Sequence, residues 1–334
     1  MVVVVVVVAA LAAMACGSKS GGGGGDRPLV VASIFPIYDL TRQVAGDAVR
    51  VELLLRPGRG VHDYNPTTKD ARRVAGAKIA FIVGLDLDEW TRKVIESSGA
   101  DAAIVKLGEK VETTRFRLER VGEVDGDHDG HEGHDEGEHE HEGEHEREDD
   151  HEDDHGKPEG HHHAVDADDP HVWLSVPLAI EMVDHIAAEL GTAFPEHKGA
   201  FGANAKKLKG ELEKLHAEIG AEVETFSRKT FVTFHGSFGY FAAEYGLEIA
   251  AVIEPYPGKE PSAVYLKEVL EAIGKKPVGA LYTEPQLDSR PAEVLAKEAR
   301  LPLRVLDPVG GLENRESYEQ MMRFNLAALA ESLK

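Results

Sequence analysis

Cysteine is nearly absent from this chain of 334 residues, which contains only Cys16. A single cysteine forms no disulfide within the chain and builds no zinc site of the kind that needs several thiolates. A transition-metal site in this protein must therefore use histidine and carboxylate side chains. Cys16 also follows directly on an unbroken apolar run, residues 2–15, whose length suits a secretion signal better than a membrane span.

The residues just before Cys16 are small, which is typical of the site where a bacterial lipoprotein is cleaved and lipidated. We expect residues 1–16 to be a signal peptide with a lipobox cysteine, and residues 17–27 to be a flexible tether rich in Gly and Ser. The mature protein would then lie outside the cytoplasm, in the periplasm or on the outer face of the cytoplasmic membrane. A lipid on Cys16 would hold it to the membrane.

Basic residues are scarce relative to acidic ones, and the formal net charge is −23. Residues 123–163 hold 19 of the acidic residues against only Arg147 and Lys157, so most of the excess acidity belongs to this segment. No basic stripe with interleaved aromatics is present, and this excludes nucleic acid as an expected partner. Eleven of the 17 histidines also lie here, with almost no apolar residue. The composition predicts a disordered insertion at residues 125–163.

Motifs of nucleophilic or nucleotide-dependent enzymes are missing: there is no GxSxG elbow, P-loop or dinucleotide-binding glycine pattern. Residues 141–145 and 151–155 do match HExxH, which on a helix would supply two zinc ligands and the general base of a hydrolase. Both matches fall in the His- and Glu-rich insertion, where composition alone produces them and no apolar face supports a helix. We therefore expect that the protein is not an enzyme.

Short apolar, β-branched runs alternate with helical patterns on both sides of the insertion. Strands are expected at residues 29–34, 49–55, 78–84, 102–107, 230–234, 248–253, 278–283 and 302–306. Helices are expected at residues 36–45, 67–75, 87–98, 176–190, 238–245, 262–273, 291–299 and 315–333. This alternation predicts an α/β fold of two lobes, each a four-stranded, mainly parallel sheet with flanking helices.

One longer helix is expected between the lobes, because apolar residues recur every three or four positions. The members of this stripe are Phe201, Ala205, Leu208, Leu212, Leu215, Ile219, Val223 and Phe226. We predict an N-terminal lobe at residues 28–194, a connecting helix at 195–227 and a C-terminal lobe at 228–334.

Residues able to bind a metal follow several of the predicted strands, where open α/β sheets bind their ligands. His62 follows the second strand, His235 the fifth and Asp307 the last, while His171 precedes the middle helices. Three imidazoles with a carboxylate or a water suit tetrahedral Zn²⁺, whereas Mn²⁺ favours more oxygen ligands. Glu284 also ends a strand. We interpret it as a structural carboxylate that caps the following loop, although it could compete as a metal ligand. The fourth ligand therefore stays open between Asp307, Glu284 and water.

Several ordered motifs together resemble one family, the metal-binding component of bacterial zinc ABC importers, which is the zinc branch of the zinc/manganese solute-binding lipoproteins. The motifs are HDYNP at 62–66, DPHVWL at 169–174, FH at 234–235 with GYF at 239–241, EPQ at 284–286 and LDP at 306–308. By this resemblance His62, His171 and His235 match the zinc-binding histidines, and Asp307 matches the fourth position. Manganese relatives tend to carry a carboxylate where His235 stands.

The resemblance implies a monomer that captures Zn²⁺ outside the cytoplasmic membrane and delivers it to the permease of an ABC importer. Zinc would be the transported ligand. Two alternatives stay open: a manganese- or iron-binding member of the same class, and a zinc buffer or adhesin whose working part is the His-rich segment. The acidic, His-rich segment just before His171 is interpreted as a weak collector of zinc for the main site.

Overall fold

The computed structural model describes residues 27–113, 168–255 and 258–334. The expected signal peptide, nearly all of the tether, the acidic insertion and both HExxH matches lie outside these residues. Among the described helices, none combines the length and the apolar character that crossing a membrane requires.

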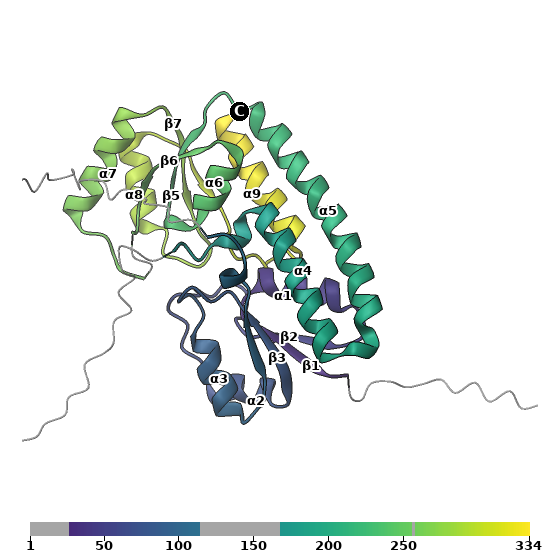
Figure 1. Ribbon diagram of the computed structural model, residues 1–334. Coiled ribbons are helices and arrows are strands. Elements are labelled where there is room, and N and C mark those ends of the chain that lie inside the picture. Colours follow the sequence, from purple (N-terminus) through teal and green to yellow (C-terminus); the bar gives the residue numbers. More distant parts are fainter. Residues whose placement is uncertain (1–26, 114–167, 256–257) are drawn as a thin grey trace, which may run out of the picture.

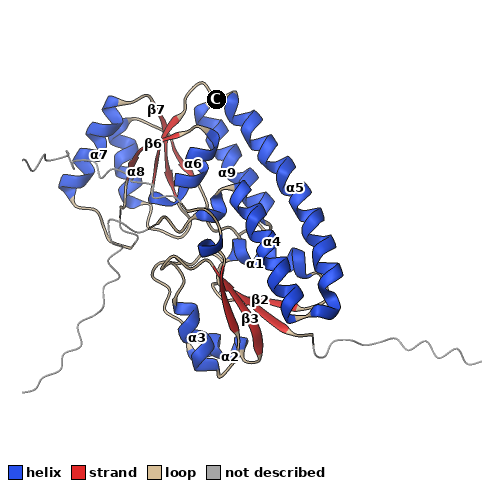
Figure 2. Cartoon of the chain, in the orientation of Figure 1, coloured by secondary structure: helices blue, strands red, loops and turns tan. Residues whose placement is uncertain are grey.

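The chain forms two four-stranded sheets in which every paired strand is parallel to its neighbour. The sheets have matching strand orders, β2-β1-β3-β4 and β6-β5-β7-β8, and Figure 2 shows them as two separate layers. The two-lobed α/β fold that the sequence predicts is confirmed. The strands are β1 (Leu29–Ala32), β2 (Arg50–Leu53), β3 (Ala77–Ile82), β4 (Ala103–Lys106), β5 (Thr230–Thr233), β6 (Glu248–Val252), β7 (Val278–Thr283) and β8 (Leu303–Val305).

Helices cover the sheets, and for this reason the central strands are continuous apolar runs and not alternating ones. All four residues of β1 and all six of β7 are buried. The helices are α1 (Phe35–Ala45), α2 (Thr68–Val74), α3 (Trp90–Ser98), α4 (Val176–Ala193), α5 (Lys198–Glu224), α6 (Gly239–Tyr245), α7 (Ala263–Lys275), α8 (Arg290–Ala299) and α9 (Tyr318–Leu333).

The connecting helix α5 runs along one side of the molecule (Figure 1) and buries the predicted apolar stripe from Phe201 to Val223. It begins three residues later than predicted, because Phe194 before Pro195 has a non-helical backbone, with φ of −133° and ψ of 69°, and a 3₁₀ turn, Pro195–His197, precedes the helix. α5 packs on α4, α1 and α9, so it contacts helices of both lobes.

A single large hydrophobic core joins the two lobes through α4 and α5. It contains Ile34 and Phe81 of the first lobe, Leu212 of α5, and Phe231 and Leu329 of the second lobe. Two smaller clusters lie in the outer parts of the lobes, one around Val94 and one around Val269. Because the lobes share packed side chains, large movements of one lobe against the other would disrupt buried contacts.

Like α5, two further helices begin three residues later than the sequence predicts, each because of a specific loop. Helix α3 starts at Trp90 because Leu85 and Asp86 adopt left-handed backbone conformations, with φ of 51° and 61°. Asp88 then accepts hydrogen bonds from the backbone N–H groups of Val83 and Gly84. Helix α9 starts at Tyr318, because the side chain of Ser317 caps it.

Candidate metal centre

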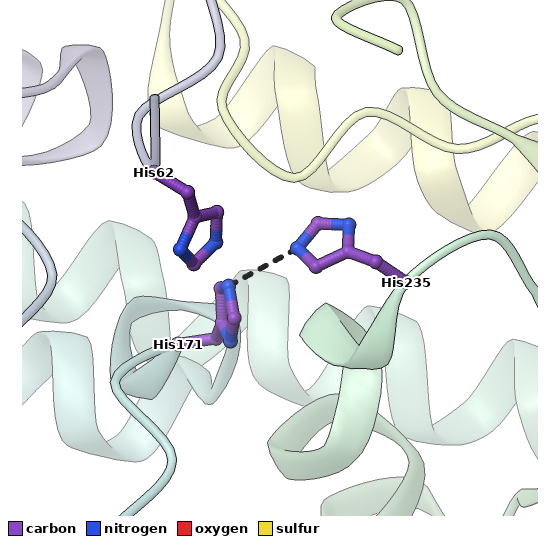
Figure 3. Close-up of side chains that lie close together, drawn as sticks. All are labelled: His62, His171 and His235. Carbon is purple, nitrogen blue, oxygen red and sulfur yellow. Dashed lines mark hydrogen bonds between the residues drawn. The ribbon is translucent and has the colours of Figure 1, made fainter. Parts of the chain in front are cut away.

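Three histidines from distant parts of the sequence lie close together, with their rings pointing toward one another (Figure 3). His62 lies in the loop between β2 and α2, His171 just before a 3₁₀ turn (Val172–Leu174), and His235 just after β5. One ring nitrogen of each lies within 4.8 Å of those of the other two. The ring centroids are 5.1 to 5.5 Å apart.

The distance between two of these nitrogens fits a tetrahedral zinc site. Nε2 of His171 lies 3.3 Å from Nε2 of His235. Two imidazole nitrogens bound to the same zinc ion at about 2.0–2.1 Å with tetrahedral angles are about 3.3 Å apart. The two rings therefore already have the spacing that such an ion requires.

Each of these two histidines is oriented by a buried carboxylate at its other nitrogen. Asp169 Oδ1 lies 2.6 Å from Nδ1 of His171, and Glu284 Oε1 lies 2.7 Å from Nδ1 of His235. A carboxylate only accepts hydrogen bonds, so Nδ1 carries the proton and the Nε2 lone pair points toward the centre. Two lone pairs facing each other at 3.3 Å repel unless a proton or a cation lies between them.

Glu284 shows where sequence reasoning assigned a different role. The sequence predicts that this carboxylate caps the following loop, but its Oε1 lies against the ring and the backbone N–H of His235, at 2.7 and 3.4 Å. Ser237 also reaches it, with its Oγ at 3.5 Å. Sequence reasoning missed that Asp169 and Glu284 orient the rings of His171 and His235. The available signals were the two-residue spacing of Asp169 and His171, and the position of Glu284 at the end of β7 beside β5.

The same carboxylate raises the pKa of His235. Burial of the ring lowers this pKa, but the charge and hydrogen bond of Glu284, followed by the charges of Asp169 and Glu254, outweigh burial. His235 therefore holds a proton more tightly than an exposed histidine does. A cation at the centre must displace that proton.

The loop that carries His62 is anchored at both ends. Before His62, the carbonyl of Val61 accepts a hydrogen bond from Trp90 Nε1 at 3.2 Å, and the Trp90 ring packs on Tyr64. After it, Asp70 receives hydrogen bonds from the backbone N and Oγ1 of Thr67 in the capping box of α2. These anchors fix the backbone of the loop near His62.

Asp307 is placed differently from the three histidines and is not in their cluster. Its side chain is fully buried after β8, and Oδ1 accepts hydrogen bonds from the backbone of Val309 and Gly310 and from Gln286 Nε2. Oδ2 lies 3.1 Å from Nη1 of Arg315. The structure thus brings together His62, His171 and His235, while Asp307 is engaged in its own network.

Comparison with known proteins gives the family. A family model described as "Zinc-uptake complex component A periplasmic" matches residues 30–332. The chain is 31% identical over 310 residues to the "Zinc-binding lipoprotein AdcA" of Streptococcus pneumoniae, covering 91% of this chain and 55% of that protein. It is 30% identical over 313 residues to the "High-affinity zinc uptake system protein ZnuA" of Bacillus subtilis, covering 92% of this chain and 88% of the relative.

A solved structure, "Crystal structure of ZnuA", superposes with a TM-score of 0.72 at 22% identity and covers 92% of this chain and all of the other, which supports the fold. The chain spans about half the length of the AdcA relatives that it matches. The matched residues nevertheless extend over both lobes, and their range includes all three clustered histidines. The chain belongs to the family of the periplasmic component A of zinc-uptake complexes.

Proposed function

We propose that the protein binds Zn²⁺ outside the cytoplasmic membrane and hands it to an ABC-type importer, and that binding rather than chemical turnover is its activity. The observation that carries this proposal is the pair of imidazole Nε2 atoms 3.3 Å apart, with each ring oriented by a carboxylate at its other nitrogen. Family membership and the names of the relatives support zinc as the cargo.

We propose His62, His171 and His235 as the ligands. Three neutral imidazoles favour Zn²⁺ over Mn²⁺, which prefers more oxygen ligands. Asp307 as the fourth ligand stays a prediction, and its Oδ2 lies 3.1 Å from Nη1 of Arg315. Glu284, whose Oε1 lies 2.7 Å from Nδ1 of His235, and water are the alternatives for the fourth position.

Competition titration tests the proposal. The metal-free protein is titrated with Zn²⁺ against a chromophoric chelator, so that only tight binding is scored. We expect one tight site. Sharing the roughly 10–16 kcal/mol of a four-ligand zinc site among its ligands gives about 3 kcal/mol each, so His62→Ala, His171→Ala and His235→Ala should each weaken binding by roughly a hundredfold or more.

His197→Ala is the matched control, because His197 lies in the 3₁₀ turn before α5 with its side chain 39% exposed. Its zinc affinity should equal that of the wild type. The proposal is wrong if the three variants bind zinc as tightly as His197→Ala. Parallel titration with Mn²⁺ tests the manganese alternative, which predicts that Mn²⁺ competes with Zn²⁺ at comparable concentrations.

The anchoring of the protein is a second part of the proposal. We propose that Cys16 is lipidated and holds a monomeric protein at the outer face of the cytoplasmic membrane, where it meets the permease. Mass spectrometry of the membrane fraction should find a diacylglycerol-modified Cys16, and Cys16→Ala should release the protein into the soluble extracytoplasmic fraction. Equal membrane retention of both forms would contradict lipid anchoring.

The acidic, His-rich segment is proposed to collect zinc at several weak sites. Eleven histidines among 19 acidic residues provide neutral imidazoles in a negative field that concentrates cations. Deleting residues 126–160 should lower the total zinc stoichiometry while the tight site remains. If the deletion leaves the zinc stoichiometry unchanged, the proposal that this segment collects zinc is wrong.

A further inference from the structure

The backbone on both sides of His171 is held by two tyrosine hydroxyls that come from the C-terminal lobe. Tyr240 of α6 donates a hydrogen bond to the carbonyl of Asp169 at 2.9 Å. Tyr318 of α9 donates one to the carbonyl of Trp173 at 2.7 Å. The side chains are nearly or fully buried, with exposures of 5% for Tyr240 and zero for Tyr318.

The turn after His171 is fixed at a further point by its own indole ring. Trp173 is fully buried, and its Nε1 donates to the carbonyl of Pro308 at 2.7 Å. The Trp173 ring lies 5.3 Å from the ring of His171. The segment from Asp169 to Trp173 is therefore attached to α6, to α9 and to the loop after β8, and the ligand lies between these attachments.

Tyr318 is itself immobilised at its backbone. Its N–H donates to Oδ2 of Asp39 on α1 at 2.8 Å, and Asp39 also pairs with Arg42 at 2.5 Å. Ser317 caps the helix that starts at Tyr318. The hydroxyl that holds the His171 segment therefore extends from a residue bound to both lobes, and its position cannot adjust without breaking buried hydrogen bonds.

We propose that Tyr240 and Tyr318 are positioning residues for the metal ligand His171. By fixing the carbonyls of Asp169 and Trp173 they hold the imidazole where its Nε2 faces that of His235. A ligand held within about 0.5 Å of its bound position binds a cation without a cost of ordering, and small displacements weaken all the bonds to the ion. This inference rests on the proposed zinc site.

The test compares three Tyr→Phe variants of the full chain. Tyr240→Phe and Tyr318→Phe each remove one of the two hydroxyls. Tyr282→Phe is the control, because Tyr282 is also fully buried and its hydroxyl also donates to a backbone carbonyl, that of Ala328 at 3.4 Å, but on α9 and not beside His171. Thermal unfolding gives the stability of each variant, and zinc affinity and release into excess chelator are measured well below the transition.

We expect Tyr240→Phe and Tyr318→Phe to bind zinc about tenfold more weakly and to release it faster. A loss of this size is typical when a residue that holds a metal ligand in place by a hydrogen bond is replaced. Absorption bands of Co²⁺ bound in place of zinc should shift in these two variants, because the bands report ligand geometry. Tyr282→Phe should lose stability and keep the wild-type affinity, release rate and Co²⁺ spectrum.

Equal zinc affinity and equal Co²⁺ spectra in all three variants would overturn the inference, as would a matching loss of affinity in Tyr282→Phe. If Tyr318→Phe does not fold, Tyr240→Phe against the same control decides the outcome. Failure of the proposed function is distinguishable, because then the wild-type protein itself shows no tight zinc site that depends on His171.

Discussion

The two lobes share one strand order but hold their histidines in different ways. In the C-terminal lobe, His235 lies close after β5, and Glu284, directly after the neighbouring strand β7, contacts both its ring and its backbone N–H. In the N-terminal lobe, His62 lies well beyond β2, and the bonds at Trp90 and Asp70 fix the loop backbone around it. In the C-terminal lobe a carboxylate therefore orients the ring of His235 directly. In the N-terminal lobe only the backbone of the loop that carries His62 is held in place.

A related contrast separates two acids at the ends of adjacent strands of the C-terminal lobe. Glu284 after β7 supports a proposed ligand, whereas Asp307 after β8 binds Arg315, Gln286 and two backbone N–H groups. Similar positions at one sheet edge thus place one carboxylate against the ring of His235 and the other in a network with the loop beyond its strand. Variants of these residues test how far the contrast holds.

The largest effect is expected for Asp307→Asn, measured as the free energy of unfolding. Asp307 is fully buried and Arg315 is 14% exposed, so removing the negative charge leaves a largely buried guanidinium without compensation. Breaking such a pair from one side costs about 3–5 kcal/mol. Urea unfolding of the metal-free protein measures the loss. Asp184→Asn, which breaks the exposed pair with Lys209, is the control and should change little.

Zinc titration of the same variant then decides the fourth ligand. If Asp307 binds the ion, Asp307→Asn lowers zinc affinity by roughly a hundredfold in addition to its effect on stability. If Asp307 only holds the loop after β8, affinity measured on the folded protein stays at the wild-type value. An unchanged free energy of unfolding would show that the network around Asp307 does not stabilise the fold.

Removing the carboxylates behind the rings should have the next largest effect. Glu284→Gln and Asp169→Asn replace an acceptor with an amide that can also donate, so Nδ1 no longer has to carry the proton. Each variant should bind zinc about 10- to 100-fold more weakly in competition titration. Glu254→Gln is the control, because Glu254 is also buried but accepts its hydrogen bond from the backbone N–H of Gly258. An equal loss of zinc affinity in that control would mean that the nearby negative charge, and not the hydrogen bond to the ring, supports zinc binding.

The sequence predicted the fold well where one local signal decides the outcome. The stripe of α5 and the run of β7 are continuous patterns, and β7 occupies the predicted residues 278–283. The end of a parallel strand also has a defined place, so His62 and His235 could each be assigned to the carboxyl edge of its own sheet. What the sequence could not supply was the direction of each side chain. Asp307 and Glu284 both end strands, and only packing against Arg315 or His235 separates them.

Zinc binding should weaken as the pH falls, and His235 should set part of the range. Its pKa is raised, so in the metal-free protein the ring is protonated at a higher pH than an exposed histidine. Zinc must displace this proton, and affinity should fall by up to about tenfold per pH unit below the raised pKa. In Glu284→Gln the fall should begin at a lower pH. A pH profile identical to that of the wild type would contradict the assigned cause.

The stability of the metal-free protein should respond to pH with the opposite sign. A histidine whose folded pKa is raised contributes stability below its unfolded pKa, and this contribution is lost as pH rises through the folded value. For His235 the loss therefore begins near pH 6.5 and continues above it. Difference measurements between wild type and His235→Gln, by urea unfolding from pH 5.5 to 8, isolate this contribution from those of other groups.

The smallest effect is expected in the N-terminal lobe, for Trp90→Phe. This change removes the hydrogen bond to the carbonyl of Val61 and keeps an aromatic ring against Tyr64. One neutral hydrogen bond contributes about 1 kcal/mol, and its loss acts on His62 only through the loop, so zinc affinity should fall roughly two- to fivefold. Asn204→Ala, which removes a side-chain bond to the carbonyl of Val44 far along α1, should leave affinity unchanged. A loss of zinc affinity in Trp90→Phe as large as that in Glu284→Gln would contradict this order. The loop backbone would then position the ring of His62 as strictly as a carboxylate positions that of His235, and the two lobes would hold their histidines by different contacts with equal effect.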